Sequence, residues 1–177
     1  MPAGAGKPPR SARTLRYDLP ADEAYRLEPI GVVHSPFQWR EEAPRQPGVA
    51  EVPNAAIVLR PGWQNTLQDL GGFSHLWVLA WFHRSRGWKP QIVPPRDTVK
   101  RGLFATRAPD RPNPIGLSVV RIVAIFGTRI DIADHDLLDG TPVLDLKPYI
   151  PAYDAKPEAT AGWVDSLQDP GPDHRLR

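Results

Sequence analysis

Short apolar segments alternate along most of the chain with polar segments rich in proline and glycine. The segments whose apolar residues predict strands are 27–35, 55–60, 73–84, 101–107, 117–126 and 129–134. Gly127 and Thr128 predict a tight turn, and Asp139–Gly140 predicts another that leads into a short alternating strand. Residues 61–73 predict one short helix that ends at a pair of glycines.

Segment 73–84 differs from the others because it is apolar on both faces. Read with a period of two residues, one face carries Trp77 and Trp81 and the other carries Leu76 and Val78. A strand of this kind is typical of a central position in a sheet, where both faces are buried.

Many short strands separated by turns, with a single short helix, predict an all-β barrel or sandwich. Strands do not alternate with long helices, which disfavours a doubly wound sheet. Residues 1–25 are polar and predict a disordered basic arm. Residues 26–153 form the predicted folded domain, and residues 154–177 the predicted polar C-terminal tail.

Proline is the unusual component of the composition, with 22 residues among 177, whereas average usage is about 5%. Its spread through the chain argues against long helices. The absence of cysteine excludes a disulfide framework and a thiolate nucleophile or metal ligand. The sequence has neither a run of roughly 18 apolar residues nor an apolar N-terminal segment typical of a signal peptide, so we expect a cytoplasmic protein.

Charge is distributed unevenly although the net charge is only +2. From Arg84 to Arg111 there are eight Lys and Arg against two Asp, and from Thr128 onward ten Asp and Glu against five Lys and Arg. The basic span also holds Trp88 and Phe104. Basic side chains interleaved with aromatic rings suit a phosphate backbone and stacked bases, although solvated loops can have the same composition.

The stretch RPNPIGLS, residues 111–118, stiffens the backbone just before a predicted strand. Pro112 and Pro114 fix φ and remove backbone donors, and Asn113 is forced towards an extended conformation by the proline that follows it. The stretch therefore predicts a rigid ledge that holds Arg111 and Asn113 in one orientation. An ordinary proline-rich start of a strand has the same signature.

Several common kinds of site are absent from the sequence. The five histidines show no metal-binding spacing, and His75 and His83, on one predicted strand, would lie about 26 Å apart. There is no phosphate-binding GxxxxGK[ST] loop, no GxGxxG fingerprint and no GxSxG nucleophile motif. The sequence thus predicts neither a metal centre nor a Rossmann cofactor site.

Polar stretches that flank the predicted strands lie at residues 44–48, 73–77, 82–84, 104–118 and 136–149. In a barrel, loops at one rim converge on a common pocket. Such a pocket would hold arginines for a carboxylate, acidic residues for hydroxyls and an amine, and aromatic rings for a base. This combination suits a zwitterionic nucleoside ligand, although the polar residues of each stretch alone are also explained by the formation of a turn.

Together the stretches resemble the TsaA-like family, whose characterised bacterial members are the TrmO tRNA methyltransferases. The matching motifs, in family order over residues 29–152, are GVVHSPF, PRQPG, GFSHLWVLAWFH, WKP with PPR, GLFATRAPDRPNPIGLS and DLLDGTPVLDLKPYIP. The resemblance implies a single antiparallel β-barrel with one or two short helices. It also implies a homodimer that binds S-adenosyl-L-methionine, without a metal, near the subunit contact.

The resemblance further implies methylation of N6 of N6-threonylcarbamoyladenosine at position 37, in the anticodon region of tRNA. The residues it assigns to the cofactor are Pro44, Arg45, Gln46, His83, Arg84, Arg107, Leu117, Asp136, Leu137, Leu138 and Asp139. Arginine suits the methionine carboxylate because it can bind it bidentately. Substrate binding is assigned to Arg111, Lys100 and Arg101.

Methyl transfer to a weakly nucleophilic amine depends on alignment of the reacting atoms and is helped by a proton acceptor. Asp139 and Asn113 are assigned to the catalytic centre. Asp139 and His83 are both candidate acceptors, and a carboxylate of the substrate is a third. The sequence does not choose among them.

Three features depart from the family pattern. The usual serine after the ATR motif is Ala108, and the position after the FH motif, often Gln, is Arg84. Larger members carry a second C-terminal domain, whereas this chain ends about 25 residues beyond the last motif. We expect the basic span 84–111 and the arginine-bearing arm to replace that domain in holding tRNA.

Two other functions fit the same motifs. One is a methyltransferase that acts on a small molecule, and the other is a regulatory module that binds S-adenosyl-L-methionine without turnover. The basic span favours tRNA over a small molecule, and only turnover separates an enzyme from a regulatory module.

Overall fold

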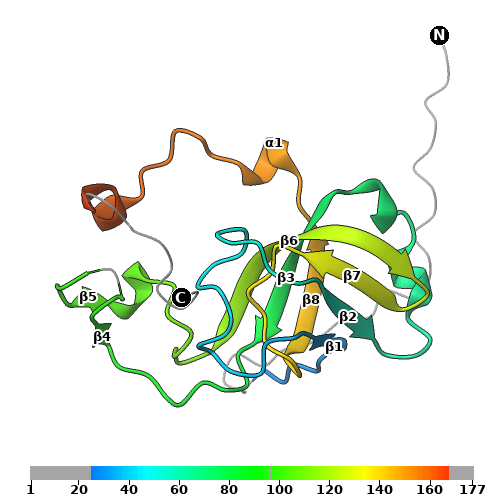
Figure 1. The fold of residues 1–177 in the computed structure, drawn as a ribbon, viewed down its shortest axis with the longest axis horizontal. Coiled ribbons are helices and arrows are strands. Elements are labelled where there is room, and N and C mark those ends of the chain that lie inside the picture. The colour runs from blue at the N-terminus through cyan, green and yellow to red at the C-terminus, as the bar shows by residue number, and fades with distance from the viewer. Residues whose placement is uncertain (1–24, 96, 168–177) are drawn as a thin grey trace, which may run out of the picture.

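The computed structural model describes residues 25–95 and 97–167, and its main body is a closed barrel of six antiparallel strands (Figure 1). The strands are β1 (Gly31–His34), β2 (Ala55–Leu59), β3 (His75–Trp81), β6 (Ile115–Phe126), β7 (Arg129–Ala133) and β8 (Pro142–Pro148). Their order around the barrel is β1-β2-β7-β6-β3-β8, and β8 pairs with β1 to close it. The predicted antiparallel barrel is confirmed, while residues 1–24 of the predicted arm and 168–177 of the predicted tail lie outside the described residues.

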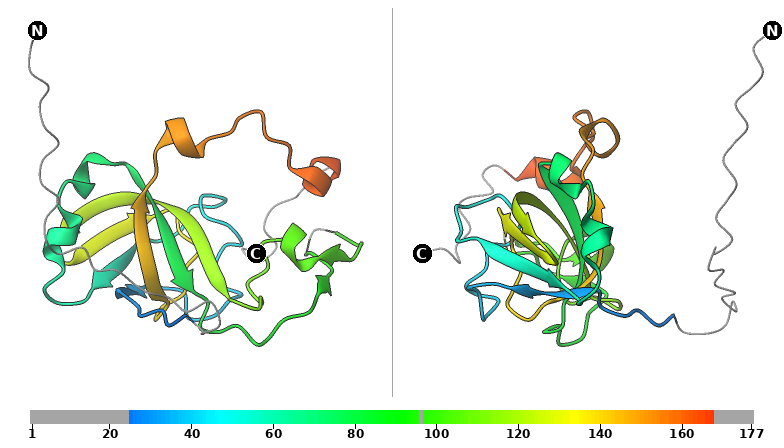
Figure 2. Two further views of the ribbon diagram at one scale, coloured as in Figure 1. Left: turned by 180° about the vertical axis from the view of Figure 1, so that it is seen from behind. Right: turned by 90° about the vertical axis from the view of Figure 1, so that its right-hand side faces the viewer.

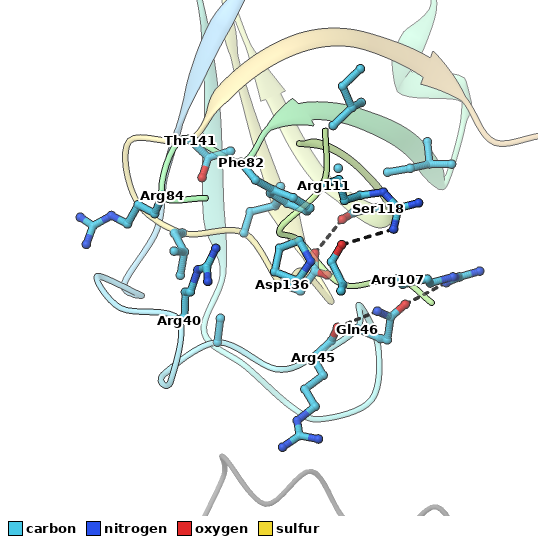
Figure 3. A pocket seen from close by; sticks show the side chains of 18 of the residues that line it. Arg40, Arg45, Gln46, Phe82, Arg84, Arg107, Arg111, Ser118, Asp136 and Thr141 are labelled. Atoms are coloured by element: carbon cyan, nitrogen blue, oxygen red, sulfur yellow. Dashed lines mark hydrogen bonds between the residues drawn. The ribbon is translucent and has the colours of Figure 1, made fainter. Parts of the chain in front are cut away.

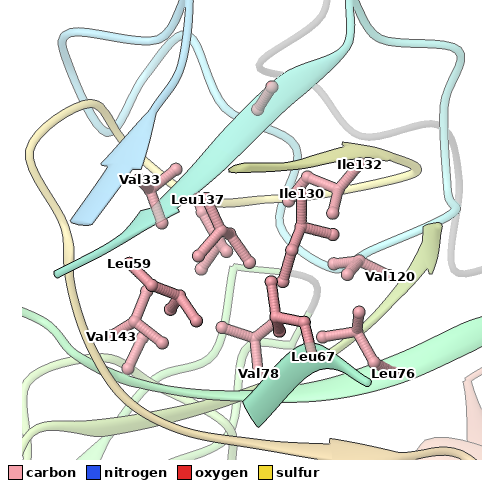
Figure 4. Packing of buried hydrophobic residues seen from close by; sticks show 13 residues of the cluster. Val33, Leu59, Leu67, Leu76, Val78, Val120, Ile130, Ile132, Leu137 and Val143 are labelled. Carbon is pink, nitrogen blue, oxygen red and sulfur yellow. The ribbon is translucent and has the colours of Figure 1, made fainter. Parts of the chain in front are cut away.

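The core fills the inside of the barrel with the alternate residues of each strand (Figure 4). On β3, Leu76, Val78 and Ala80 are fully buried, while the residues that alternate with them are only half-buried. Ile130 and Ile132 of β7 and Leu137 of the following loop meet them from the other side. The outer face of β3 is thus less buried than its apolar sequence predicts.

Strand β6 is long enough to belong to both halves of the barrel. Its first half pairs with β3, with Trp81 opposite Ile115, and its second half pairs with β7. The register shifts between Ile122 and Ala124, and a bulge of this kind bends a strand and increases its twist. The bend lets β6 follow the curvature of the barrel, so that one strand pairs with β3 and then with β7.

A small lobe projects from the barrel between β3 and β6 (Figures 1 and 2). It contains the short pair β4 (Gln91–Ile92) and β5 (Arg101–Gly102) and the 3-10 helix η3 (Leu103–Ala105). After β8 the chain runs through α1 (Pro151–Asp154) to the 3-10 helix η4 (Gly162–Ser166) beside this lobe. There the indole Nε1–H of Trp163 donates to the Ala105 carbonyl oxygen at 2.8 Å.

Four local predictions were wrong in extent. The predicted strand 27–35 is strand only at Gly31–His34. The predicted helix 61–73 is two 3-10 turns, η1 (Gln64–Leu67) and η2 (Leu70–Gly72), split by Asp69 at φ 65°. The predicted strand 101–107 is strand only at Arg101–Gly102. Strand β3 ends at Trp81. Phe82 N–H still donates in register to the Pro114 carbonyl oxygen at 2.7 Å, but Pro114 has no N–H to donate in return, and His83 N–H then turns back to the Trp81 carbonyl oxygen at 2.8 Å.

Candidate functional site

A cavity of about 380 Å³ opens where β3 ends and β6 begins (Figure 3). Trp77 of β3 and four segments line it: residues 40–46, the turn after β3, residues 106–118, and the loop 136–141. Its volume lies in the range of small-molecule sites, about 300–1,000 Å³. The convergence of loops at one rim, expected from the sequence, is what the structure shows.

One wall of the cavity is formed by Phe82 against Gly116. A Cβ atom added to Gly116 would lie 2.4 Å from Cζ of Phe82. Gly116 therefore creates the space that the ring occupies, because real side chains do not approach so closely. The apolar side chains Leu117, Leu137 and Leu138 extend the lining.

A second wall carries basic and amide groups from two distant segments. Nη1–H of Arg107 donates to Oε1 of Gln46 at 2.8 Å, and Nε2–H of Gln46 donates to the Arg45 carbonyl oxygen at 2.7 Å. These bonds join residues 45–46 to residue 107 and fix the guanidinium of Arg107 beside the cavity (Figure 3). The wall can therefore present positive charge to an anionic group of a ligand.

The loop 136–141 contributes one carboxylate to the cavity. The buried hydroxyl of Ser118 donates to Oδ1 of Asp136 at 2.6 Å. The preceding His135 is fully buried, accepts from Leu137 N–H at Nδ1, and donates from Nε2 to the Pro53 carbonyl oxygen at 3.0 Å. Burial lowers the pKa of His135, so this neutral imidazole anchors the loop that presents Asp136.

Asp110 ties three of the lining segments together. Its carboxylate accepts two hydrogen bonds from the Arg40 guanidinium, at 2.7 and 3.2 Å, and others from the Ser85 hydroxyl and the Arg86 amide. The hydrogen bonds from Arg40 are the main reason that the pKa of Asp110 falls to about 2, and the Arg40 pKa is raised in return. The walls are thus connected by a charged cluster.

His83 also lines the cavity. Partial burial and then the neighbouring Arg84 guanidinium lower its pKa, while Asp139 acts in the opposite direction. The imidazole is therefore neutral at physiological pH and can accept a proton.

The sequence model of the tRNA-methyltransferase O N-terminal domain family, TrmO_N, matches residues 32–155 of this chain. The chain belongs to the TrmO family. It is 37% identical over 153 residues to an Escherichia coli tRNA (adenine(37)-N6)-methyltransferase, covering 81% of this chain and 65% of that protein. It is also 41% identical over 128 residues to an Archaeoglobus fulgidus S-adenosyl-L-methionine-binding protein, covering 72% of this chain and 91% of that protein.

Solved structures of TrmO have the same fold. The Pseudomonas aeruginosa TrmO crystal structure aligns with a TM-score of 0.67 and 38% identity, over 79% of this chain and 62% of that one. A second TrmO crystal structure aligns with a TM-score of 0.69 and 38% identity, over 80% of this chain and 64% of that one. This chain thus spans less than two thirds of the length of those TrmO chains.

The structure brings together ten of the eleven residues predicted to bind the cofactor. Those that line the cavity are Pro44, Arg45, Gln46, His83, Arg84, Arg107, Leu117, Asp136, Leu137 and Leu138. The eleventh, Asp139, is not among the lining residues. Its carboxylate instead accepts from Ser35 N–H at 3.0 Å, and this bond is the main cause of its lowered pKa.

Of the predicted substrate and catalytic residues, only Arg111 lines the cavity. Nη1–H of Arg111 donates to the Thr106 carbonyl oxygen at 2.9 Å. Asn113 and Lys100 are exposed outside the lining, and Arg101 pairs with Asp97 at 2.7 Å in the lobe. The ledge therefore orients Arg111 towards the cavity but does not bring Asn113 into it.

Several lining residues were missed by the sequence reasoning, among them Arg40, Phe82, Thr106, Ser118 and Thr141. Phe82 and Ser118 lie within recognised motifs, so their positions offered a signal. Arg40 offered none, because its pairing with Asp110 spans 70 positions in the chain.

Proposed function

We propose that this chain transfers a methyl group from S-adenosyl-L-methionine to N6 of N6-threonylcarbamoyladenosine at position 37 of tRNA. The observation that carries the proposal is the single cavity that gathers the predicted cofactor residues from four separate segments. Membership of the TrmO family and the names of its relatives supply the reaction class.

The donor set of the cavity fits S-adenosyl-L-methionine. Arg107 and Arg45 suit the methionine carboxylate, and Asp136 suits the ammonium group or the ribose hydroxyls. Phe82 and Leu117 offer apolar surface to the adenine ring. The bound cofactor would supply the electrophilic methyl group.

The chain's own residues have two tasks in this reaction. The hydrogen-bonded Arg45–Gln46–Arg107 wall holds one reactant in place, and orientation of this kind accounts for much of the rate of a displacement reaction. Of the two candidate proton acceptors that the chain itself supplies, His83 is the better placed, because it lines the cavity while Asp139 is committed to Ser35. We therefore assign the acceptor role to neutral His83.

Arg84→Gln is expected to shift the acid limb of the pH–rate profile to higher pH. Protonated His83 cannot accept a proton, so kcat/KM should fall as pH drops through its pKa. Arg84 lowers that pKa, and its removal raises the pKa towards the ordinary value. Profiles of kcat/KM for wild type, Arg84→Gln and His83→Ala test this, and an acid limb that stays in place in Arg84→Gln would contradict the assignment.

The reaction itself is tested with methyl-labelled S-adenosyl-L-methionine and tRNA with or without the threonylcarbamoyl group. We expect label only on the modified tRNA. In Arg107→Ala, cofactor affinity should fall about tenfold or more, since bonds to charged groups are among the stronger ones. Arg129→Ala is the matched control, because Arg129 pairs with Asp131 on β7 away from the cavity lining.

Cofactor binding without label on either tRNA would overturn the proposed reaction. It would favour a small-molecule acceptor or a regulatory module instead. The homodimer implied by the family resemblance and the cytoplasmic location expected from the sequence stay predictions, and sedimentation at several protein concentrations tests the first. Within residues 25–95 and 97–167, no helix is long and apolar enough to span a membrane.

A further inference from the structure

Two exposed aromatic rings lie under arginine side chains beside the cavity. The Arg84 guanidinium lies 4.8 Å from the ring centre of Trp39, and the Arg111 guanidinium lies 5.5 Å from that of Phe104. The rings are 58% and 78% exposed. Neither ring contributes to the core, so packing does not explain why large aromatic residues stand there.

Both arginines line the cavity, whereas the rings lie beyond them. The two guanidinium groups lie on either side of Phe82 in Figure 3. Each arginine–aromatic pair therefore continues a cavity wall out to the surface. The Arg84 pair also accounts for the charged residue at a family position that is often Gln, because Arg84 covers Trp39.

The Arg111–Phe104 pair is held in place by contacts that do not involve a ligand. Arg111 donates from Nη1 to the carbonyl oxygens of Thr106 and Ala108, at 2.9 and 3.4 Å. Phe104 belongs to the 3-10 helix η3, whose residue Ala105 accepts the bond from Trp163. A preordered ring next to a fixed cation loses little conformational freedom when a flat partner stacks on it.

We propose that Trp39 and Phe104 stack on unpaired nucleobases of the RNA loop that carries the methyl acceptor, with Arg84 and Arg111 close to its phosphates. The inference rests on the proposed tRNA substrate and deepens it by naming the groups that recognise the loop. Sequence-specific proteins bind single-stranded RNA loops by stacking splayed bases on aromatic and arginine side chains. The alternation of ring and cation suits this ligand better than a continuous apolar patch would.

The test is binding of an anticodon stem–loop RNA and of the same RNA with abasic sites in the loop. The abasic form keeps the phosphates and removes the stacking partners. Wild type should bind the intact loop on the order of tenfold more tightly per stacked ring. The double variant Trp39→Ala/Phe104→Ala should bind both RNAs alike, with unchanged affinity for S-adenosyl-L-methionine.

Phe126→Ala is the matched control, because Phe126 is 65% exposed at the opposite end of β6 from the cavity. Trp39→Phe combined with Phe104→Tyr should restore the preference for the intact loop. Equal binding of both RNAs by wild type, or a double variant that behaves like Phe126→Ala, would overturn the inference. Weak RNA binding in every protein would do so too.

The inference and the proposed reaction fail separately. Loop binding that depends on the two rings, without methyl transfer to any tRNA, keeps the inference and removes the reaction. Methyl transfer that is unaffected in Trp39→Ala/Phe104→Ala keeps the reaction and removes the inference.

Discussion

Replacing Gly116 with alanine should abolish measurable binding of S-adenosyl-L-methionine while leaving the barrel folded. The new Cβ would meet Cζ and Cε1 of Phe82 at 2.4 and 2.5 Å, so the ring must move. The backbone of Phe82 is fixed by its bond to the Pro114 carbonyl oxygen. The ring, which lines the cavity, therefore has to leave its wall.

Overpacking of this kind typically lowers the free energy of unfolding by about 1–3 kcal/mol. Thermal unfolding measures this loss of stability, and calorimetry with S-adenosyl-L-methionine measures binding. The control is the double variant Gly116→Ala/Phe82→Ala, in which the collision cannot occur. Contact with Phe82 predicts that the double variant loses less unfolding free energy than the two single variants lose together. If the losses simply add, contact with Phe82 does not explain why residue 116 is glycine.

The barrel and most of the cavity lining were predictable because each depends on local signals. Turns such as Gly127–Thr128 and Asp139–Gly140 occur where expected, with φ of 59° at Gly127 and 73° at Gly140. Motif residues such as Arg107 and Asp136 reach the cavity because the motifs stand at strand ends, and strand ends meet at one rim.

What the sequence could not show depends on side-chain orientation and on distant partners. The sequence does not show that the Asp139 carboxylate faces Ser35 N–H, a residue 104 positions away, and so leaves the cavity lining. It equally cannot show that Phe82 lies opposite Pro114, which has no N–H to continue the pairing, so that β3 ends early. Asp69 breaks the predicted helix by a left-handed conformation that non-glycine residues rarely adopt.

Asp110→Asn should loosen the cavity walls and weaken cofactor binding about tenfold. The Asp110 carboxylate connects Arg40 in one segment to Ser85 and Arg86 in another, and itself stands in the third. Asparagine keeps the shape but loses the charge and one acceptor oxygen. Hydrogen bonds to charged groups contribute about 1.5–3 kcal/mol each when shielded from solvent. Losing them should therefore cost more than losing an ordinary surface ion pair.

The free energy of unfolding should fall by less than the energies of these hydrogen bonds suggest. The Arg40 and Asp110 side chains are 29% and 38% exposed, and exposed ion pairs are screened by solvent. We expect Asp110→Asn to lower the free energy of unfolding by about 1–2 kcal/mol at neutral pH, and Asp131→Asn by less than about 0.5 kcal/mol. Asp131 is the control because it pairs with Arg129 on β7, outside the cavity lining.

The Asp110 contribution should disappear in acid, and the direction follows from its pKa. The folded-state pKa is about 2, below the ordinary 3.8, so the unfolded chain binds the proton more readily. The stabilisation is therefore fully present above about pH 4 to 5 and is lost as pH falls towards 2. Denaturant unfolding from pH 7 to pH 2 should show the wild-type and Asp110→Asn curves converging. Curves that stay parallel over this range would show that the charge of Asp110 does not hold the walls together.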